Sequence, residues 1–271
     1  TNSLEIDGKI ARNYIITPER YRNSQLAVMG TICHELGHLL GAPDYYDPNE
    51  TNGSYYALGN YDIMDRGSWN NEGRTPANCN PYSKCYTFGW DTPTIISRMT
   101  KDYNLSSSTI SKGHVYRMNT STNGEYFLLE NRTKENYDQH IPNGGLLIYH
   151  IHKNISTTGA YNNDIHPLKL YLVNASAITE PNNSSSSYGS YATPRAYPGN
   201  SGTKTMFTNT SIPSAKAWDG SETGVNICFI QKNSNGDITF TVNPEIQGSS
   251  QLCRTRDYCV SGIVPAQPVI A

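Results

Sequence analysis

The spacing of apolar residues indicates one long helix near the start of the chain. Apolar side chains recur at helical spacing over about residues 25–40, which predicts a helix, and Ser24 is a suitable N-cap. These positions occupy most of the helix circumference, so both flanks of the helix need a cover. They are Leu26, Met29, Ile32, Cys33, Leu36, Leu39 and Leu40.

Beyond residue 100 the pattern changes to short β-branched or aromatic runs separated by Gly, Asn and Pro turns. Seven such runs predict an antiparallel, sandwich-like β region, and Ser-Asn-Gly at 234–236 predicts the hairpin turn between the last two. The runs are residues 113–118, 125–132, 145–152, 168–175, 204–208, 224–231 and 237–242.

The remaining segments give weaker patterns. Residues 9–17 predict one strand, and residues 80–88 predict a short helix. Residues 180–203 are typical of a long, mobile surface loop. No periodicity follows residue 243, where the sequence resembles a disulfide loop and a linker. We therefore expect three parts, 1–100, 101–245 and 246–271, of which the second continues the first.

The pentapeptide His34-Glu35-Leu36-Gly37-His38 lies within the predicted helix. Helix positions i and i+4 share a face, so His34 and His38 can bind one zinc ion. Glu35 can reach a water on that ion, where a carboxylate serves as general base. This spacing predicts a zinc-dependent hydrolytic site.

The residues after the helix offer a third zinc ligand. Gly41 supplies the positive φ at which helices end, and Pro43 cannot continue a helix, so the chain turns back. This turn returns Asp44 to the metal at the ligand spacing of a known class of zinc peptidases. His34, His38 and Asp44 leave one coordination position open, as catalytic zinc requires. Asp47 and the distant Glu130 are the alternative third ligands.

Met64 lies at a suitable distance to form a methionine turn beneath the histidine rings. Together these residues resemble the M6, or immune inhibitor A-like, metallopeptidases of the metzincin type. The resemblance continues to about residue 180, although Tyr149 and His152 depart from the Trp and Asp expected there. The segments that carry it are residues 34–47, 59–69, 88–90, 125–132 and 144–151.

The resemblance implies an α+β fold with a zinc-peptidase core followed by the β-rich region. It also implies a sheet ahead of the zinc helix, but only about 24 residues precede that helix, enough for one strand. We therefore expect exposed apolar side chains on the helix, and a cleaved or missing upstream segment as a partner of the chain.

Other polar residues near the motif have two readings each. Carboxylates at Asp47, Glu50, Asp62 and Asp65 are candidates for a calcium ion or are solvated loop residues. His150 and His152 share a strand face, as a second metal site or as a structural pair. The candidates for stabilising the oxyanion of the reaction are Tyr56, Tyr61 and Arg66.

The composition limits which cellular compartment and which kinds of partner the chain can have. The net charge is −2 without a basic block, so nucleic-acid binding has no electrostatic support, and no apolar run is long enough to span a membrane. Six cysteines indicate an oxidising compartment. The short loops Cys79–Cys85 and Cys253–Cys259 are the favoured disulfides, while pairing of Cys33 with Cys228 stays open.

Several glycosylation sequons accompany this polar, tyrosine-rich composition. They begin at Asn52, Asn104, Asn119, Asn131, Asn154, Asn174, Asn182, Asn183 and Asn209. The sequence thus predicts a secreted or cell-surface zinc endopeptidase acting on protein or peptide substrates. The alternative is a non-catalytic extracellular glycoprotein that retains the peptidase fold.

Overall fold

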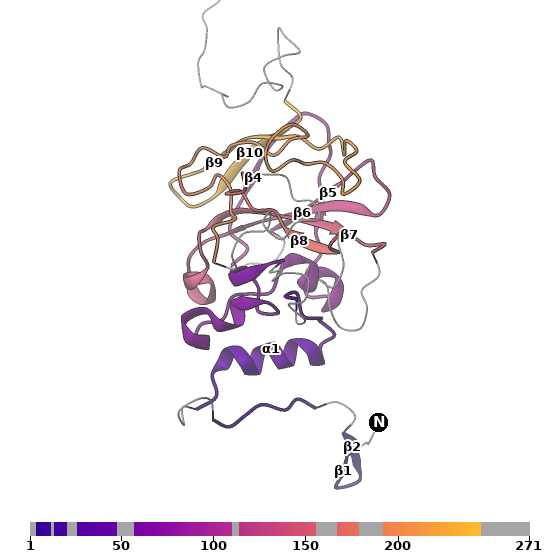
Figure 1. The fold of residues 1–271 in the computed structure, drawn as a ribbon, viewed down its shortest axis with the longest axis vertical. Helices are drawn as coiled ribbons and strands as arrows, with labels where there is room; N and C mark the ends of the chain where they lie inside the picture. The colour runs from indigo at the N-terminus through magenta and orange to yellow at the C-terminus, as the bar shows by residue number, and fades with distance from the viewer. Residues whose placement is uncertain are drawn as a thin grey trace, which may run out of the picture.

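A five-stranded sheet occupies the middle of the molecule (Figure 1). The structure is a computed structural model, and it describes residues 4–11, 14–20, 26–47, 57–109, 114–155, 167–178 and 192–244. The sheet order is β3-β5-β6-β7-β8, antiparallel except for the parallel pair β3–β5. The strands are β3 (Thr94–Ile95), β5 (Val115–Asn119), β6 (Glu125–Arg132), β7 (Gly145–His152) and β8 (Leu170–Leu172).

A three-stranded antiparallel sheet covers one face of this central sheet (Figure 1). Its order is β4-β10-β9, formed by β4 (Lys101–Leu105), β9 (Ile227–Lys232) and β10 (Ile238–Val242). Phe127 of β6 packs edge-on against Phe207, with ring centroids 5.2 Å apart, and Phe207 in turn pairs with Ile227 of β9. The two sheets therefore share one apolar layer, as the predicted sandwich requires.

The opposite face of the central sheet carries the short helical turns and α1 (Figure 1). The turns are the 3₁₀ helices η2 (Gly59–Tyr61) and η3 (Arg66–Gly73), and the π-helical η4 (Ser83–Thr87). A further 3₁₀ turn, η5 (Asn136–His140), connects β6 and β7. With layers on both faces, β6 is buried at every position and β7 at every position but His152, so neither strand needs an alternating pattern.

The helix α1 (Met29–Leu39) is shorter than the sequence predicts. Its N-cap is Val28, without a side-chain cap, and Ser24 lies outside the described residues. Only Gly30 and Gly37 are buried, where glycine lets the helix approach the backbone of Ser68 and the side chain of Met64 closely. A close approach on one face leaves the other face of α1 away from the body of the molecule.

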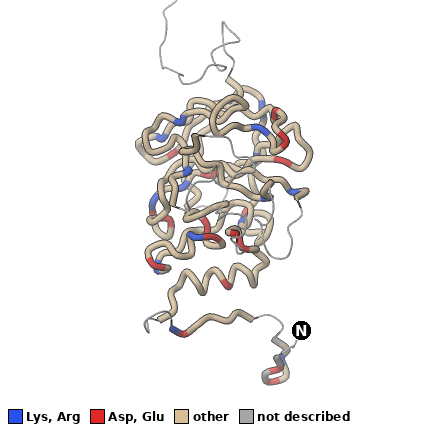
Figure 2. The backbone as a smooth tube through the Cα atoms, in the orientation of Figure 1, with Lys and Arg blue, Asp and Glu red and all other residues tan. Residues whose placement is uncertain are grey.

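The expected exposure of apolar side chains on α1 is confirmed. The helix carries one charged residue, Glu35, and is otherwise free of charged residues (Figure 2). Exposed fractions reach 43% at Met29, 40% at Leu36 and 50% at Leu40 just beyond the helix. The described N-terminal residues, including Ile16 at 79% exposed, leave these side chains exposed.

Several predicted elements have different bounds. Within residues 9–17 only β2 (Lys9–Ala11) forms, and it pairs with β1 (Leu4–Ile6) instead of extending to residue 17. The run 204–208 gives a single bridge at Phe207 in place of a strand, and β3 and β4 are not among the predicted runs. The hairpin turn at 234–236 is confirmed, because the amide of Asn233 donates to Asp237 across it.

The predicted surface loop at 180–203 is wrong for its described end. Arg195, Ala196 and Tyr197 are fully buried, and Tyr197 pairs with Leu146 at the start of β7 through two backbone hydrogen bonds of 2.8 and 3.0 Å. The part before residue 192 lies outside the described residues. The burial of Arg195, Ala196 and Tyr197 and the backbone pairing of Tyr197 make these residues part of the core.

The predicted disulfide between Cys79 and Cys85 does not form, and both residues are free thiols. Burial raises the pKa of each thiol to about 12, so both behave as small apolar side chains. Cys33 on α1 is also a free thiol, which excludes the bond to Cys228. Cys253 and Cys259 lie outside the described residues.

None of the helices in the described ranges has the length and apolar character needed to cross a membrane. Lys and Arg are scattered among Asp and Glu along the chain (Figure 2), which agrees with the absence of a basic block in the sequence.

Candidate metal centre

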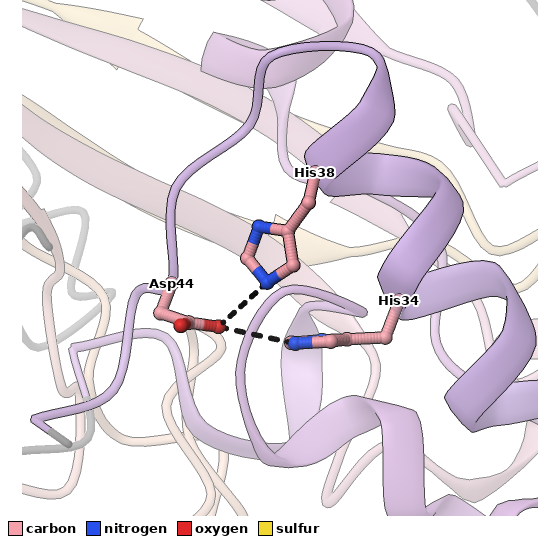
Figure 3. Close-up of side chains that lie close together, drawn as sticks. All are labelled: His34, His38 and Asp44. Atoms are coloured by element: carbon pink, nitrogen blue, oxygen red, sulfur yellow. Dashed lines mark ion pairs between the residues drawn. The ribbon is translucent and has the colours of Figure 1, made fainter. Parts of the chain in front are cut away.

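The end of α1 is built to turn the chain back toward the helix. The amide of Gly41 donates to the carbonyl of His38 (2.9 Å), and the amide of Ala42 donates to that of Gly37 (3.0 Å). This pair of bonds is a Schellman cap, which needs a left-handed residue, and Gly41 supplies it with φ +99°. The turn after Gly41 carries Asp44 back past the last turn of the helix (Figure 3).

His34, His38 and Asp44 converge on one point (Figure 3). Oδ1 of Asp44 lies 3.1 Å from Nε2 of His34 and 3.3 Å from Nε2 of His38. One ligand atom from each residue lies within 4.8 Å of the others, and no second such trio occurs in the described part of the chain. Neither Asp47 nor Glu130 belongs to this group.

The hydrogen bonds of the imidazoles direct lone pairs toward that point. Nδ1 of His34 lies 2.9 Å from the carbonyl of Ile63, and Nδ1 of His38 lies 2.9 Å from the carbonyl of Ala42. A carbonyl only accepts, so Nδ1 carries the hydrogen and Nε2 of the neutral ring has a free lone pair. Such a second contact on the far nitrogen is typical of metal-binding histidines.

The carboxylate at the centre of the group lacks a donor. Oδ1 of Asp44 is buried and accepts no hydrogen bond from the described residues. A buried anionic oxygen facing two nitrogen lone pairs is costly unless a cation or protons lie between them. Two imidazoles and one carboxylate are a suitable donor set for zinc, so these residues fit a zinc ion.

The pKa shifts of His34, His38 and Asp44 also favour positive charge beside the Asp44 carboxylate. Burial alone would raise the pKa of Asp44, but the two imidazoles lower it to about 2. Burial would lower the pKa of His34, yet the Asp44 carboxylate and the Ile63 carbonyl raise it overall. The carboxylate of Asp44 also raises the pKa of His38 against burial. Both shifts favour the charged form of the imidazoles in the metal-free protein.

Met64 forms the floor under the helix. Its side chain is fully buried, and a Cβ built at Gly37 would overlap its sulfur. Gly37 stands between the two histidines in sequence, so Met64 packs against α1 at the level of the site. The preceding carbonyl, that of Ile63, is the one that orients His34.

Two buried carboxylates hold this methionine turn, in place of the calcium site or solvated loop considered from the sequence. Asp62 Oδ1 accepts from the amide of Met64 at 2.7 Å. Asp65 Oδ2 accepts from the amides of Leu58 and Gly59, both at 2.9 Å. Hydrogen-bond donors occupy these oxygens, so Asp62 and Asp65 do not form a calcium site. Glu50 lies outside the described residues.

The part of the chain that holds this site matches a known family. Residues 2–89 match the family described as immune inhibitor A peptidase M6, catalytic domain. These residues belong to the M6 peptidase family. The match includes His34, His38, Asp44 and Met64, while the β-rich segments that also resemble the family lie beyond it. A search of curated proteins finds no match to the chain.

In this M6 peptidase segment, the turn that carries Met64 is anchored to the central sheet by Arg132, which the sequence analysis did not single out. Its guanidinium is fully buried and donates to Glu130 Oε1 (2.8 Å), to the carbonyl of Tyr61 (2.6 Å) and to that of Cys79 (2.7 Å). Glu130 is therefore held by Arg132 on β6. The sequence did contain a signal for this ion pair: Glu130 and Arg132 are opposite charges at positions i and i+2 of one predicted strand.

The three candidates for stabilising the oxyanion of the reaction differ in their positions. Tyr61 is fully buried, and its hydroxyl donates to Asn143 and accepts from the amide of Arg195 at 3.0 Å, so it cannot contact a substrate. Tyr56 lies outside the described residues. Arg66 lies near the M6 site, with its guanidinium carbon 5.7 Å from the ring centroid of Tyr46.

Tyr46 is the second residue at the site that the sequence analysis missed. Its ring centroid lies 6.3 Å from that of His34. Burial and the charge of Asp44 raise the pKa of its phenol to about 12. Its place two residues after Asp44 was the available signal.

His150 and His152 form a structural pair around one carboxylate. Nε2 of His150 lies 2.6 Å from Glu125 Oε2, and Nε2 of His152 lies 3.6 Å from Glu125 Oε1. His150 is buried and stacks on Trp218, with ring centroids 4.7 Å apart and 13° between planes. Within the described ranges, no trio of converging ligand atoms includes His150 or His152, so nothing supports a second metal site there.

Proposed function

We propose that this chain is a secreted zinc endopeptidase that hydrolyses peptide bonds in protein substrates. The observation that carries the proposal is the convergence of two imidazole lone pairs and the orphaned Asp44 Oδ1 on one point. The peptidase family of residues 2–89 supports the reaction class. Three protein ligands leave an open position, as hydrolytic zinc sites require.

His34, His38 and Asp44 would hold the zinc. When bound, zinc supplies Lewis acidity, which polarises the scissile carbonyl and makes water a stronger acid. Glu35 provides the base: it lies next to His34 on α1, is half-buried, and its charge contributes to the raised pKa of His38. Its carboxylate takes a proton from the attacking water and returns it to the amine nitrogen as the C–N bond breaks.

Secretion rests on the polar, tyrosine-rich composition and on the exposed sequons. Asn104, Asn119 and Asn154 are exposed. Asn131 is fully buried, and its side-chain nitrogen donates to the carbonyls of Leu105 and Gly236, so this sequon cannot be modified in the folded protein. A short disulfide loop would have supported secretion, but Cys79 and Cys85 are free thiols and give no such support.

The test compares two carboxylate-to-amide variants of the full chain. In Glu35→Gln, zinc content should stay at one equivalent while casein hydrolysis falls by several orders of magnitude, because the base is lost and no ligand is changed. Glu72→Gln is the matched control, since Glu72 is 76% exposed beside Arg74, and it should retain both. A chelator should abolish hydrolysis by the parent protein.

Full activity in Glu35→Gln would overturn the mechanism. A parent protein that binds zinc but hydrolyses no peptide bond would instead favour the non-catalytic glycoprotein.

A further inference from the structure

The peptide bond between Ile63 and Met64 has a hydrogen bond at each end. Its carbonyl accepts from Nδ1 of His34 at 2.9 Å, and its N–H donates to Oδ1 of Asp62 at 2.7 Å. A trans peptide is planar, so its C=O and N–H point in opposite directions and cannot turn independently. The carboxylate that fixes the N–H of this peptide therefore also fixes the direction of the carbonyl that His34 contacts.

Asp62 is itself held through its other oxygen. Oδ2 accepts from the backbone amide of Asn80 and from the side-chain nitrogen of Asn80, the latter at 2.8 Å. Asn80 is fixed in turn, because its Oδ1 accepts from the backbone amide of Ser83 at 2.9 Å. Asp62, Met64, Asn80 and Ser83 are all fully buried. Donors on both oxygens thus fix the position of the Asp62 carboxylate.

The charge of this carboxylate adds to its effect on the peptide. Burial raises the pKa of Asp62 to about 6 against the nearby charge of Arg132, so the carboxylate is charged at neutral pH. An anion on the N–H polarises the peptide and makes its carbonyl a stronger hydrogen-bond acceptor. A stronger acceptor on Nδ1 of a histidine makes Nε2 more basic and hence a better metal ligand.

The second histidine of the site has no such arrangement. Nδ1 of His38 lies 2.9 Å from the carbonyl of Ala42, and the nitrogen of that peptide belongs to Pro43, which has no N–H. No carboxylate can therefore act on His38 through its peptide partner. The two histidines differ in this one respect, which makes His38 an internal control for His34.

We propose that Asp62 is a positioning residue of the metal centre, which acts on His34 through the Ile63–Met64 peptide. The inference rests on the proposed zinc site and deepens it. By holding the peptide, Asp62 keeps the Nδ1 hydrogen of His34 on the carbonyl and the Nε2 lone pair directed to the point where His38 and Asp44 converge. A ring that is already fixed loses less entropy when it binds a cation.

The experiment compares two buried carboxylates of the same turn in the full chain. Asp62→Asn should bind zinc about 10-fold more weakly in competition with a chromophoric chelator, the lower end of the effect of an outer partner, because the charge on the peptide N–H is lost. Asp65→Asn is the matched control. Asp65 is also buried, but its Oδ2 accepts from the amides of Leu58 and Gly59, so the affinity should equal that of the parent.

NMR spectra of the metal-free protein separate positioning from a general loss of structure. In Asp62→Asn the Nδ1 proton signal of His34 should move upfield, because its hydrogen bond to the carbonyl is weaker, while that of His38 should stay. In Asp65→Asn both signals should stay. Parent-like zinc affinity or an unchanged His34 signal in Asp62→Asn would overturn the inference. Equal shifts of the two histidines, or the same loss of affinity in both variants, would overturn it as well.

The parent protein provides a test that does not depend on how a variant folds. Adding zinc to the metal-free parent should make Nδ1–H of His34 a stronger donor to the Ile63 carbonyl, which polarises the peptide and moves the amide proton of Met64 downfield. The amide protons of Leu58 and Gly59, held by Asp65, should not move. A Met64 amide signal that stays in place with theirs would contradict the link through the peptide.

The affinity and NMR readouts keep this inference distinct from the proposed function. A parent protein that binds zinc without peptidase activity still yields the Asp62 result, whereas a parent that binds no zinc overturns the zinc site and the role of Asp62 together.

Discussion

Gly37 and Met64 are in direct contact where α1 crosses the methionine turn, and the missing side chain of Gly37 makes the space for the sulfur. Any Cβ at this position overlaps the Met64 side chain. The contact lies between the two histidines in sequence, so the depth at which α1 sits on the turn sets the position of both imidazoles. Glycine at the centre of the His34–His38 motif is thus a packing requirement.

The first prediction follows from this contact. Gly37→Ala should lower the free energy of unfolding by about 1–3 kcal/mol, as overpacking of a filled core does, despite the better helix propensity of alanine. Urea denaturation of the metal-free protein measures it. Adding Met64→Ala should cost less than the sum of the two single changes, because the shortened side chain makes room. Additive losses would show that the two residues are not coupled.

A second prediction concerns the third ligand. Asp44→Ala should weaken zinc binding by more than the about 10- to 100-fold that loss of an outer partner causes, because it removes a donor atom from the metal. Asp47→Ala is the control, since Asp47 is also buried but does not belong to the converging trio. Equal zinc content in purified Asp44→Ala and parent protein would refute the assignment.

The third prediction is the pH dependence of the metal-free protein. The pKa values of His34 and His38 are raised in the folded state, so their contribution to stability is present below the ordinary histidine pKa and is lost as pH rises through the folded values. The pKa of Asp44 is lowered from 3.8 to about 2, so its contribution is lost only as pH falls toward about 2. The trio therefore stabilises the fold most between about pH 4 and 6.5.

Thermal unfolding in the presence of a chelator tests this prediction. The Tm should fall between pH 6 and pH 8, and Asp44→Asn should reduce that fall because the amide no longer favours the charged imidazoles. Zinc should reverse the trend, since the metal needs deprotonated ligands. A Tm of the chelated parent that rises over this range would contradict the assignment.

The parts of the fold that the sequence predicted are those fixed by short-range rules. The turn from α1 to Asp44 follows from the positive φ of Gly41 and from Pro43, and both lie within a few residues of the ligands. The strands β6 and β7 follow from their apolar runs. The start of α1 at Met29 did not follow, because its apolar residues extend to Leu26 without marking where the helix begins.

Long-range contacts were the part that sequence reasoning could not reach. Arg132 lies far along the chain from the carbonyls of Tyr61 and Cys79 that it binds, and a buried arginine has no signature until its partners are known. Tyr46 is adjacent to a ligand, but its contact with Arg66 depends on how two turns pack. The short Cys79–Cys85 loop had a low entropic cost, yet both residues are free thiols that pack, partly buried, against the core.

The last prediction concerns the buried ion pair that anchors the methionine turn. Arg132 and Glu130 are both fully buried, and burial of Glu130 is offset by Arg132 and Lys84, which lower its pKa. Arg132→Met should cost about 3–5 kcal/mol of unfolding free energy, because it leaves a buried carboxylate without its main partner. Breaking the exposed pair by Arg74→Gln, where Arg74 is 61% exposed, should cost at most about 1 kcal/mol.

The same variant should affect the metal site, because Arg132 donates to the carbonyl of Tyr61, two residues before the Ile63 carbonyl that orients His34. Zinc affinity of Arg132→Met should fall under conditions where the protein is still folded by circular dichroism, and that of Arg74→Gln should not. Replacing both buried partners, as Arg132→Met with Glu130→Gln, should restore part of the stability, since the uncompensated charge is gone. Zinc affinity should stay low in the double variant, because the donor to the Tyr61 carbonyl is still missing. If stability and zinc affinity returned together, Arg132 would serve only to neutralise Glu130 and would not anchor the turn.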